Sequence, residues 1–182
     1  MSPFIYLIDA IFSFYITIII LRFLMQLFRA DFYNPLSQFI VKITNPILKP
    51  LRRIVPGFGG IDTSSLLFAF AVAMIKISIV YSIPSFAGLV LITIRELFIS
   101  TIYLFIGMLL IRVVISWVSP GLQNPIMTVI YQLSEPVMAP VRRIIPPIGG
   151  LDLSTLILLL GLQFSIQGLD IWIFSPLLRM VS

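Results

Sequence analysis

The sequence predicts an all-α membrane protein with four transmembrane helices, arranged as two tandem parallel repeats. Two observations lead to this prediction: the apolar residues form long runs, and the second half of the chain repeats the first. Hydrophobic residues make up 59% of the sequence and charged residues only 10%, whereas a soluble domain has roughly 25% charged residues. The chain therefore lacks the polar residues needed to cover a water-facing globule.

Four apolar segments are long enough to cross a bilayer, which takes about 20 residues in helical form. We expect these helices at Phe4–Phe28, Ile61–Ile83, Leu97–Val118 and Leu151–Phe174. No basic residue precedes the first segment, and it is longer than the apolar core of a signal peptide. We therefore expect it to be a retained helix.

The two halves of the sequence superimpose without a gap when one is shifted by 90 positions. The matching positions are Arg22 with Arg112, Asn34-Pro35 with Asn124-Pro125, Pro46 with Pro136, Arg52-Arg53 with Arg142-Arg143, Gly59-Gly60 with Gly149-Gly150, and Asp62 with Asp152. This pattern indicates a tandem duplication with units at 1–90 and 91–182. Each unit reads as helix, connector, helix, with connectors at 29–60 and 119–150. Because each unit crosses the membrane twice, the two repeats are parallel rather than inverted.

Basic residues concentrate in the two connectors: Arg29, Lys42, Lys49, Arg52, Arg53, Arg142 and Arg143. The link at 82–88 carries no charge, and Arg179 stands alone near the end. Cytoplasmic loops of membrane proteins are rich in Lys and Arg, so we expect both connectors in the cytoplasm and both termini outside, in a bacterial inner membrane. The same bias accounts for the net charge of +5 without a nucleic-acid partner.

Each connector is predicted to hold an amphipathic helix lying in the headgroup region. Asn34 followed by Pro35 is typical of a helix start. Apolar residues then recur at steps of three and four, with polar residues between them, as in helices that lie in the membrane interface. We expect Pro46 and Pro50 to break this helix into short pieces.

The arginine pairs Arg52-Arg53 and Arg142-Arg143 would then lie at headgroup depth. There, each charge near an anionic surface is worth about 1 kcal/mol. Three interpretations are open: binding of a specific anionic lipid, docking of a partner protein, or a general role as topology signal and lipid anchor.

Charges within the apolar segments are candidates for function, because ionisable residues at membrane depth are rare. Arg22 and Arg112 occupy matching places near the cytoplasmic helix ends, and Asp62 and Asp152 begin the following helices. One hypothesis is that they form two ion pairs, Arg22–Asp62 and Arg112–Asp152. The alternative is that each arginine extends to the interface while each aspartate caps its helix.

A second set of charges lies toward the outer side. Counted from the outer helix ends, Asp9 and Lys76 lie at similar depths in the membrane, so they are predicted to pair. The second repeat has Ile99 and Ile166 at the matching positions. It carries Gln163, Gln167 and Asp170 instead, with Arg95-Glu96 ahead of the third segment. These groups either line an ion path or make structural contacts between helices.

The absence of Cys and His excludes disulfides and the usual ligands of zinc, copper, iron–sulfur clusters and haem. It also excludes a Ser-His-Asp triad. The acidic residues are scattered, with no spacing that indicates shared acid–base chemistry. We therefore expect a protein that is not an enzyme and has no cofactor and no metal.

The repeated string Asn-Pro…Pro-x-x-x-Pro-x-Arg-Arg-Ile-x-Pro-x-x-Gly-Gly-x-Asp-x-Ser, at 34–64 and 124–154, resembles the YggT family of small bacterial and plastid membrane proteins. With its flanking helices it covers nearly the whole chain, and two copies are similar to the proteobacterial members. The resemblance implies roles in osmotic stress tolerance, membrane integrity and ion uptake. Plastid relatives are linked to haem attachment, which does not suit a chain without His or Cys.

Two functions follow as hypotheses. The first is a non-enzymatic accessory or scaffold protein of the cell envelope that binds anionic lipids or a membrane partner through its connectors. The second is a small ion channel or a modulator of potassium uptake. Because four helices enclose little pore, the second hypothesis requires a homo-oligomer.

Overall fold

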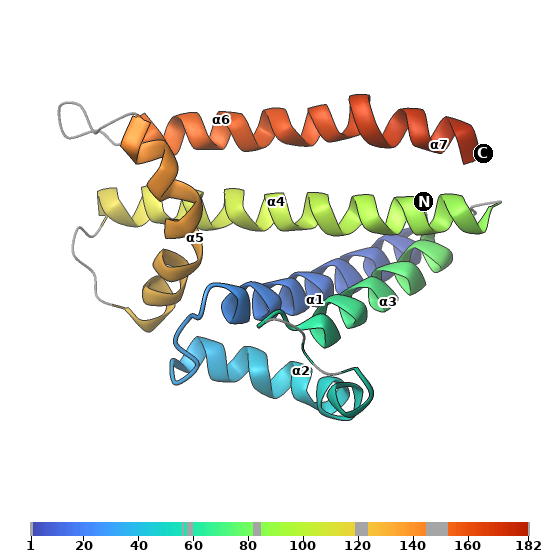
Figure 1. The fold of residues 1–182 in the computed structure, drawn as a ribbon, viewed down its shortest axis with the longest axis horizontal. Coiled ribbons are helices and arrows are strands. Elements are labelled where there is room, and N and C mark those ends of the chain that lie inside the picture. Colours follow the sequence, from blue (N-terminus) through green and yellow to red (C-terminus); the bar gives the residue numbers. More distant parts are fainter. Residues whose placement is uncertain are drawn as a thin grey trace.

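The computed structural model describes residues 2–55, 57, 60–81, 85–118, 124–144 and 153–181. Helices make up nearly all of this part of the chain (Figure 1). They are α1 (Pro3–Leu27), α2 (Pro35–Ile54), α3 (Thr63–Val80), α4 (Phe86–Val118), α5 (Pro125–Ile144), α6 (Leu153–Gly168), the π-helical segment η1 (Leu169–Phe174) and α7 (Ser175–Val181).

Four helical stretches are long and apolar enough to cross a membrane: Pro3–Leu27, Thr63–Val80, Phe86–Val118 and Leu153–Val181. Figure 1 shows α1 and α4 running in the same direction, with α3 and α6 returning beside them. The predicted all-α fold of four membrane-spanning helices in two parallel repeats is therefore confirmed.

Two of the predicted helix boundaries are wrong. α4 begins at Phe86 rather than at Leu97, and the last helix continues through η1 and α7 to Val181. The charges of Arg95 and Glu96 suggested a boundary at the start of α4. Both side chains are paired with opposite charges on neighbouring helices, so they are accommodated within the helix.

The prediction that prolines break the connectors is also wrong. α2 runs without interruption through Pro46 and Pro50, and α5 runs through Pro136 and Pro140. All four prolines are exposed. Because the two prolines of each helix are four residues apart, they lie on one side of it. The carbonyls that lose their donor can then reach solvent there, so the helix continues past the prolines instead of ending.

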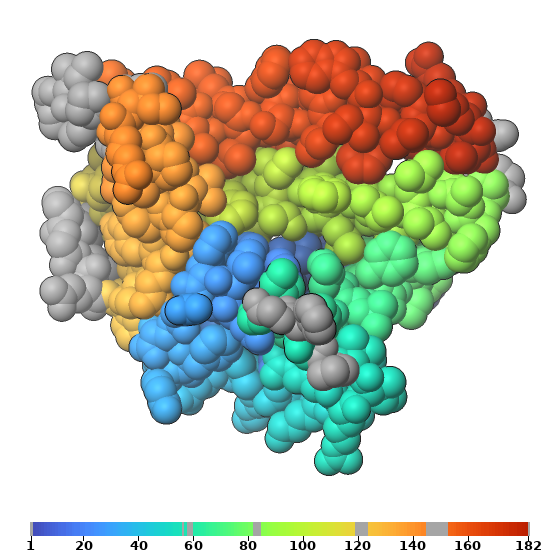
Figure 2. Space-filling view, in the orientation of Figure 1, coloured from blue at the N-terminus to red at the C-terminus, as the bar shows by residue number. Residues whose placement is uncertain are grey.

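The core lies where α1, α3 and α4 pack together, and it extends under the connectors. Ile16, Ile19 and Met25 of α1 are fully buried, as is Ala73 of α3. The second repeat is looser, and Figure 2 shows α6 and α7 as an outer band along α4. Leu160 and Phe164 of α6 are 63% and 62% exposed, which is expected of a helix that faces lipid chains.

The connector helices cover one end of the bundle. Figure 1 shows α5 crossing the ends of α4 and α6 at a steep angle, while α2 contacts α1, α3 and α5. The predicted helix starts are confirmed, because Oδ1 of Asn34 accepts from the N–H of Leu36 at 3.0 Å and Oδ1 of Asn124 accepts from that of Ile126 at 2.9 Å. Nδ2 of Asn34 also donates to the Pro125 carbonyl at 2.6 Å, which joins the two connectors.

Candidate functional site

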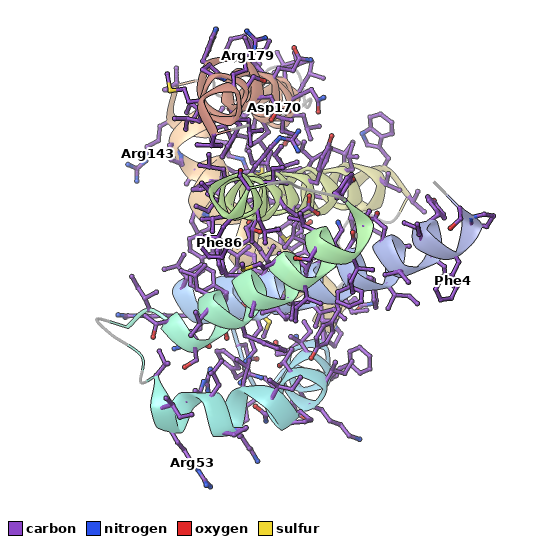
Figure 3. All side chains as sticks on the ribbon, turned by 90° about the vertical axis from the view of Figure 1, so that its right-hand side faces the viewer. Phe4, Arg53, Phe86, Arg143, Asp170 and Arg179 are labelled. Carbon is purple, nitrogen blue, oxygen red and sulfur yellow. The ribbon has the colours of Figure 1, made fainter. Side chains whose placement is uncertain are left out.

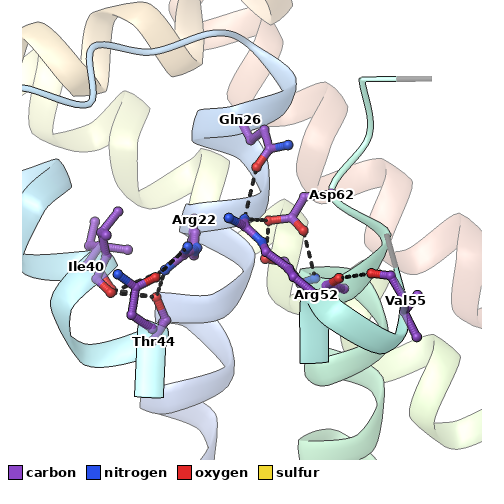
Figure 4. A network of polar contacts seen from close by, with 11 residues as sticks. Arg22, Gln26, Ile40, Thr44, Arg52, Val55 and Asp62 are labelled. Atoms are coloured by element: carbon purple, nitrogen blue, oxygen red, sulfur yellow. Dashed lines mark hydrogen bonds and ion pairs between the residues drawn. The ribbon is translucent and has the colours of Figure 1, made fainter. Parts of the chain in front are cut away.

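A buried arginine near the end of α1 holds the connector helix α2. Arg22 is 3% exposed and donates to the carbonyl of Val41 at 3.2 Å. It also donates to the hydroxyl of Thr44 and, at 2.9 Å, to Oδ1 of Asn45 (Figure 4). These contacts fix the rotation of α2 about its own axis. We call each such arginine with its two side-chain acceptors an arginine clamp.

The second repeat contains the equivalent clamp, with each residue 90 positions later. Arg112 of α4, which is 7% exposed, donates to the hydroxyl of Ser134 at 2.6 Å and to Oε2 of Glu135 at 3.2 Å. Its guanidinium carbon lies 4.4 Å from the centre of the Tyr131 ring, a distance typical of a cation–π contact. The two clamps differ in charge, because Arg22 binds neutral acceptors and Arg112 binds a carboxylate.

The predicted ion pair Arg22–Asp62 is wrong. Asp62 pairs with Arg52 instead, and Arg52 also donates to Oε1 of Gln26 at 3.1 Å. Figure 4 shows Arg52 between Gln26 and Asp62, with Arg22 directed toward Thr44. The physical reason is that the last turn of α2 brings Arg52 to the start of α3. Arg22 instead contacts α2 at Thr44 and Asn45, about two turns earlier.

Asp62 forms a compact corner between α2 and α3. It is 2% exposed, and its carboxylate accepts from the N–H and the hydroxyl of Ser65, so the predicted helix cap is confirmed here. Burial alone would raise the pKa of Asp62, but the hydrogen bonds from Ser65 and the contact with Arg52 outweigh it. The pKa of Asp62 therefore lies below its usual value, and the carboxylate stays ionised.

The second predicted pair, Arg112–Asp152, lies outside the described residues because of Asp152. Within the part of the chain that is described, Glu135 supplies the carboxylate: it pairs with Arg112 at 3.2 Å and with Arg142 at 3.0 Å. Glu135 thus connects Arg112 of α4 with Arg142 near the end of α5.

The helix α2 has three distinct sides. The side packed against the bundle carries Ser37, Ile40, Thr44 and Leu48. One flank exposes Phe39, Ile47 and Ile54. At 100° per residue, the exposed Lys42, Lys49 and Arg53 lie roughly opposite the packed side and about 100° from the apolar flank. We call them the cationic side of α2. This order matches a helix in the membrane interface, with apolar residues toward lipid chains and cations toward headgroups.

The four predicted lipid- or partner-binding arginines divide into two kinds. Arg52 and Arg142 make ion pairs with Asp62 and Glu135. Arg53 and Arg143 are exposed, and Figure 3 shows both side chains extending away from the molecule. Arg52 thus ties the end of α2 to the start of α3, whereas Arg142 pairs within α5. Both side chains stay partly exposed, at 39% and 36%, while Arg53 and Arg143 extend fully toward a headgroup or a partner.

The connector α5 lacks a cationic side. Gln132 and Ala139 stand at the positions of Lys42 and Lys49, and only Arg143 matches a cation of that side. The exposed positive charge of the connectors is therefore concentrated on the first repeat.

A second charged group lies toward the other end of the bundle and joins three helices. The predicted Asp9–Lys76 contact is present, at 3.2 Å. Lys76 is 4% exposed and also binds Oε1 of Glu96 at 2.6 Å and the hydroxyl of Ser13 at 2.7 Å. Two carboxylates around one ammonium leave this cluster with a formal charge of −1.

The remaining polar residues do not join that cluster into a path. Asp170 of η1 forms a two-bond ion pair with Arg95 of α4, at 2.6 and 2.7 Å. Gln163 and Gln167 lie on the exposed surface of α6. Arg95 directly precedes Glu96 of that cluster in α4, whereas among the described residues the two glutamines form no hydrogen bond with Asp9, Lys76 or Glu96.

Several partners were not predicted from the sequence. Thr44 and Ser134 are hydroxyl residues 90 positions apart, and Asn45 and Glu135 are acceptors at the next positions. The repeat therefore contained the signal for both clamps. Glu96 was missed because the predicted third helix began after it.

Comparison with known proteins agrees with this duplication. The sequence profile of the CCB3/YggT family matches two segments of the chain, residues 1–83 and 91–174. The chain is 48% identical over 167 residues to an uncharacterized protein encoded in the proC 3′ region of Vibrio alginolyticus, covering 88% of this chain and 89% of the relative. It is 40% identical over 161 residues to the uncharacterized protein YggT of Escherichia coli K12, covering 88% and 85% of the two chains.

No solved structure matches the chain. The two profile segments, the proteobacterial relatives and the four membrane-spanning helices agree with one another. The chain is a multi-pass membrane protein of the CCB3/YggT family.

Proposed function

We propose that this chain is a non-enzymatic protein of the bacterial inner membrane that binds anionic lipid through the cationic side of α2. In this role it acts as an accessory or scaffold protein in envelope integrity and the response to osmotic stress, with its connectors in the cytoplasm. The observation that supports the proposal is the three-sided surface of α2, whose rotation is fixed by the buried Arg22.

Because Arg22 fixes the rotation of α2, the three cations extend in one direction. This favours binding of lipid at a defined surface over a general attraction to anionic membranes. Each cation near an anionic surface contributes about 1 kcal/mol, so Lys42, Lys49 and Arg53 together contribute about 3 kcal/mol. This corresponds to a preference of about 100-fold or more for an anionic over a neutral surface. Because the side chains extend from one flank of a held helix, they meet the headgroup layer together.

The test compares lipid preference in two variants of the purified full chain. We expect Lys42→Gln/Lys49→Gln/Arg53→Gln to lose most of its preference for vesicles of phosphatidylglycerol over phosphatidylcholine in a binding assay. Arg143→Gln is the matched control, since it removes an exposed cation from the other connector. One charge is worth about 1 kcal/mol, so the control loses only about fivefold. A triple variant that keeps the full preference would contradict the proposal.

The cellular role is tested with the same variants in a strain that depends on this chain after an osmotic upshift. The triple variant is expected to support growth poorly, whereas Arg143→Gln supports it fully. Photo-crosslinking from a probe beside Lys49 separates the two forms of the proposal. Lipid adducts favour direct lipid binding, and one abundant protein adduct favours a scaffold role.

A small oligomeric ion channel, or a modulator of potassium uptake, is the second candidate. The exposed Gln163 and Gln167 on α6 favour it only in an assembly, because polar residues on a lipid-facing surface gain partners from another copy. Potassium flux into liposomes that is lost in Gln163→Leu/Gln167→Leu would support this function. The absence of flux with the unmodified chain would count against it.

A further inference from the structure

A groove of about 500 Å³ runs between α1 and α4, away from the cationic side of α2. Its volume falls in the range of about 300–1,000 Å³ that is typical of small-molecule sites. Polar residues gather toward one end, where α1 contributes Ser13 and α4 contributes Glu96 and Ser100. Thr17 and Tyr103 follow next to them, and Leu104, Met108 and Ile111 line the far part along α4. The groove is thus polar at one end and apolar at the other, as an amphiphile is.

The polar end carries unbalanced negative charge. Lys76 is shared between Asp9 and Glu96, which leaves one carboxylate charge without a cation. Charges at membrane depth are costly unless they are paired. The side chain of Glu96 is 23% exposed and lines the groove. Because an ionised carboxylate has about four acceptor positions on its two oxygens, Glu96 can accept a second donor beside Lys76.

The apolar part of the groove suits a lipid chain. The 16 residues from Glu96 to Ile111 span about 22 Å, since 15 steps separate them at about 1.5 Å each. This exceeds the roughly 15 Å that half of a 30 Å hydrocarbon core provides. A lipid whose head lies at Glu96 would therefore have room for its chain along Leu104 and Met108.

We propose that this groove binds one amine-headed phospholipid, with its ammonium at Glu96 and an acyl chain along α4. The headgroup follows from this charge: the ammonium of a zwitterionic head can pair with Glu96, whereas an anionic head such as that of phosphatidylglycerol offers no cation. The site is separate from the cationic side of α2 and has the opposite charge preference. Its success or failure is therefore independent of the proposed function.

The test is native mass spectrometry of the purified full chain, titrated with phosphatidylethanolamine and phosphatidylglycerol that carry identical chains. We expect one phosphatidylethanolamine to bind ahead of phosphatidylglycerol. Loss of a charged hydrogen bond in Glu96→Gln should weaken that molecule's binding by about tenfold. Glu135→Gln is the matched control, because it removes a carboxylate that lies in the other repeat's arginine clamp. It should leave binding of this lipid unchanged.

A second variant tests the chain-binding part without touching the charges. A Cβ at Gly107 would meet nothing within 4 Å, so Gly107→Leu fills the groove without a backbone clash. Leucine also favours helix over glycine, so the fold is retained. We expect Gly107→Leu to abolish binding of the single phosphatidylethanolamine.

Three results would overturn the proposal. The first is equal binding of the two lipids, and the second is unchanged phosphatidylethanolamine binding in Gly107→Leu. The third is that Gly107→Leu dissociates a dimer or a protein complex, which would identify the groove as a docking site for a transmembrane helix.

Discussion

Replacing Arg22 with methionine should release α2 from the bundle. The variant removes hydrogen bonds to Thr44 and Asn45, and each bond from a charged donor contributes about 1.5–3 kcal/mol. The loss is partly offset because methionine is not charged and costs little to bury. In addition, Nε of Arg22 has no hydrogen-bond partner among the described residues. We expect a net loss of about 2 kcal/mol, which is about 30-fold in the docking equilibrium.

The release of α2 from the bundle can be measured by labelling a single introduced cysteine. The chain contains no cysteine, and Ser37 is fully buried on the packed side of α2, where its Oγ has no hydrogen-bond partner among the described residues. Ser37→Cys is therefore a near-isosteric reporter, protected from a water-soluble maleimide while α2 is docked. Adding Arg22→Met should speed its labelling about 30-fold, whereas adding Arg53→Gln should not change the rate.

Unchanged protection in Arg22→Met/Ser37→Cys would refute this reasoning. It would mean that the cost of burying the guanidinium equals what its hydrogen bonds contribute, so that apolar packing alone docks α2. Slower labelling than in the Ser37→Cys chain would go further and show that Arg22 destabilises the contact.

Three further predictions concern the other charged contacts. Asn45→Glu supplies a carboxylate like that of Glu135, so it should strengthen docking of α2 by about 1 kcal/mol and slow labelling of the cysteine reporter. The pKa of Asp62 is lowered in the folded state, so its stabilisation is present above its ordinary pKa of about 4. That stabilisation is lost as the pH falls through the lower folded value, which thermal unfolding between pH 3 and 7 would detect; a flat profile contradicts it. Lys76→Met leaves two carboxylates without their cation and should lower stability by up to about 3–5 kcal/mol, measured by thermal unfolding. Adding Glu96→Gln should restore part of the loss, and no effect in either variant would contradict the pairing.

The pattern of apolar runs was enough to predict the fold, because each membrane-spanning helix must satisfy its own backbone in lipid. The matching positions of the two repeats also predicted the helix starts at Asn34-Pro35 and Asn124-Pro125. The continuity of α2 could not be predicted this way. Whether Pro46 and Pro50 break or bend a helix depends on which side faces solvent, and that is set by packing with α1.

The partners of the charges were predicted less well. Asp9 and Lys76 were matched by depth alone, and they do meet. Depth could not distinguish Arg22 from Arg52 as the partner of Asp62, because both lie near the same end of the bundle. The choice is made by the path of α2, whose last turn returns to the start of α3.

The unequal connectors give a nearly two-fold symmetric fold a direction within the plane of the membrane. Lys42, Lys49 and Arg53 place exposed positive charge beside one pair of helices, while the equivalent face of α5 keeps only Arg143. Anionic lipids would therefore gather on one side of the molecule and leave the other side close to the average composition of the bilayer. A neighbour that approaches along the membrane meets two different lipid environments, depending on which repeat it reaches first. Duplication followed by the loss of two lysine positions, or by their gain, is sufficient to create that difference.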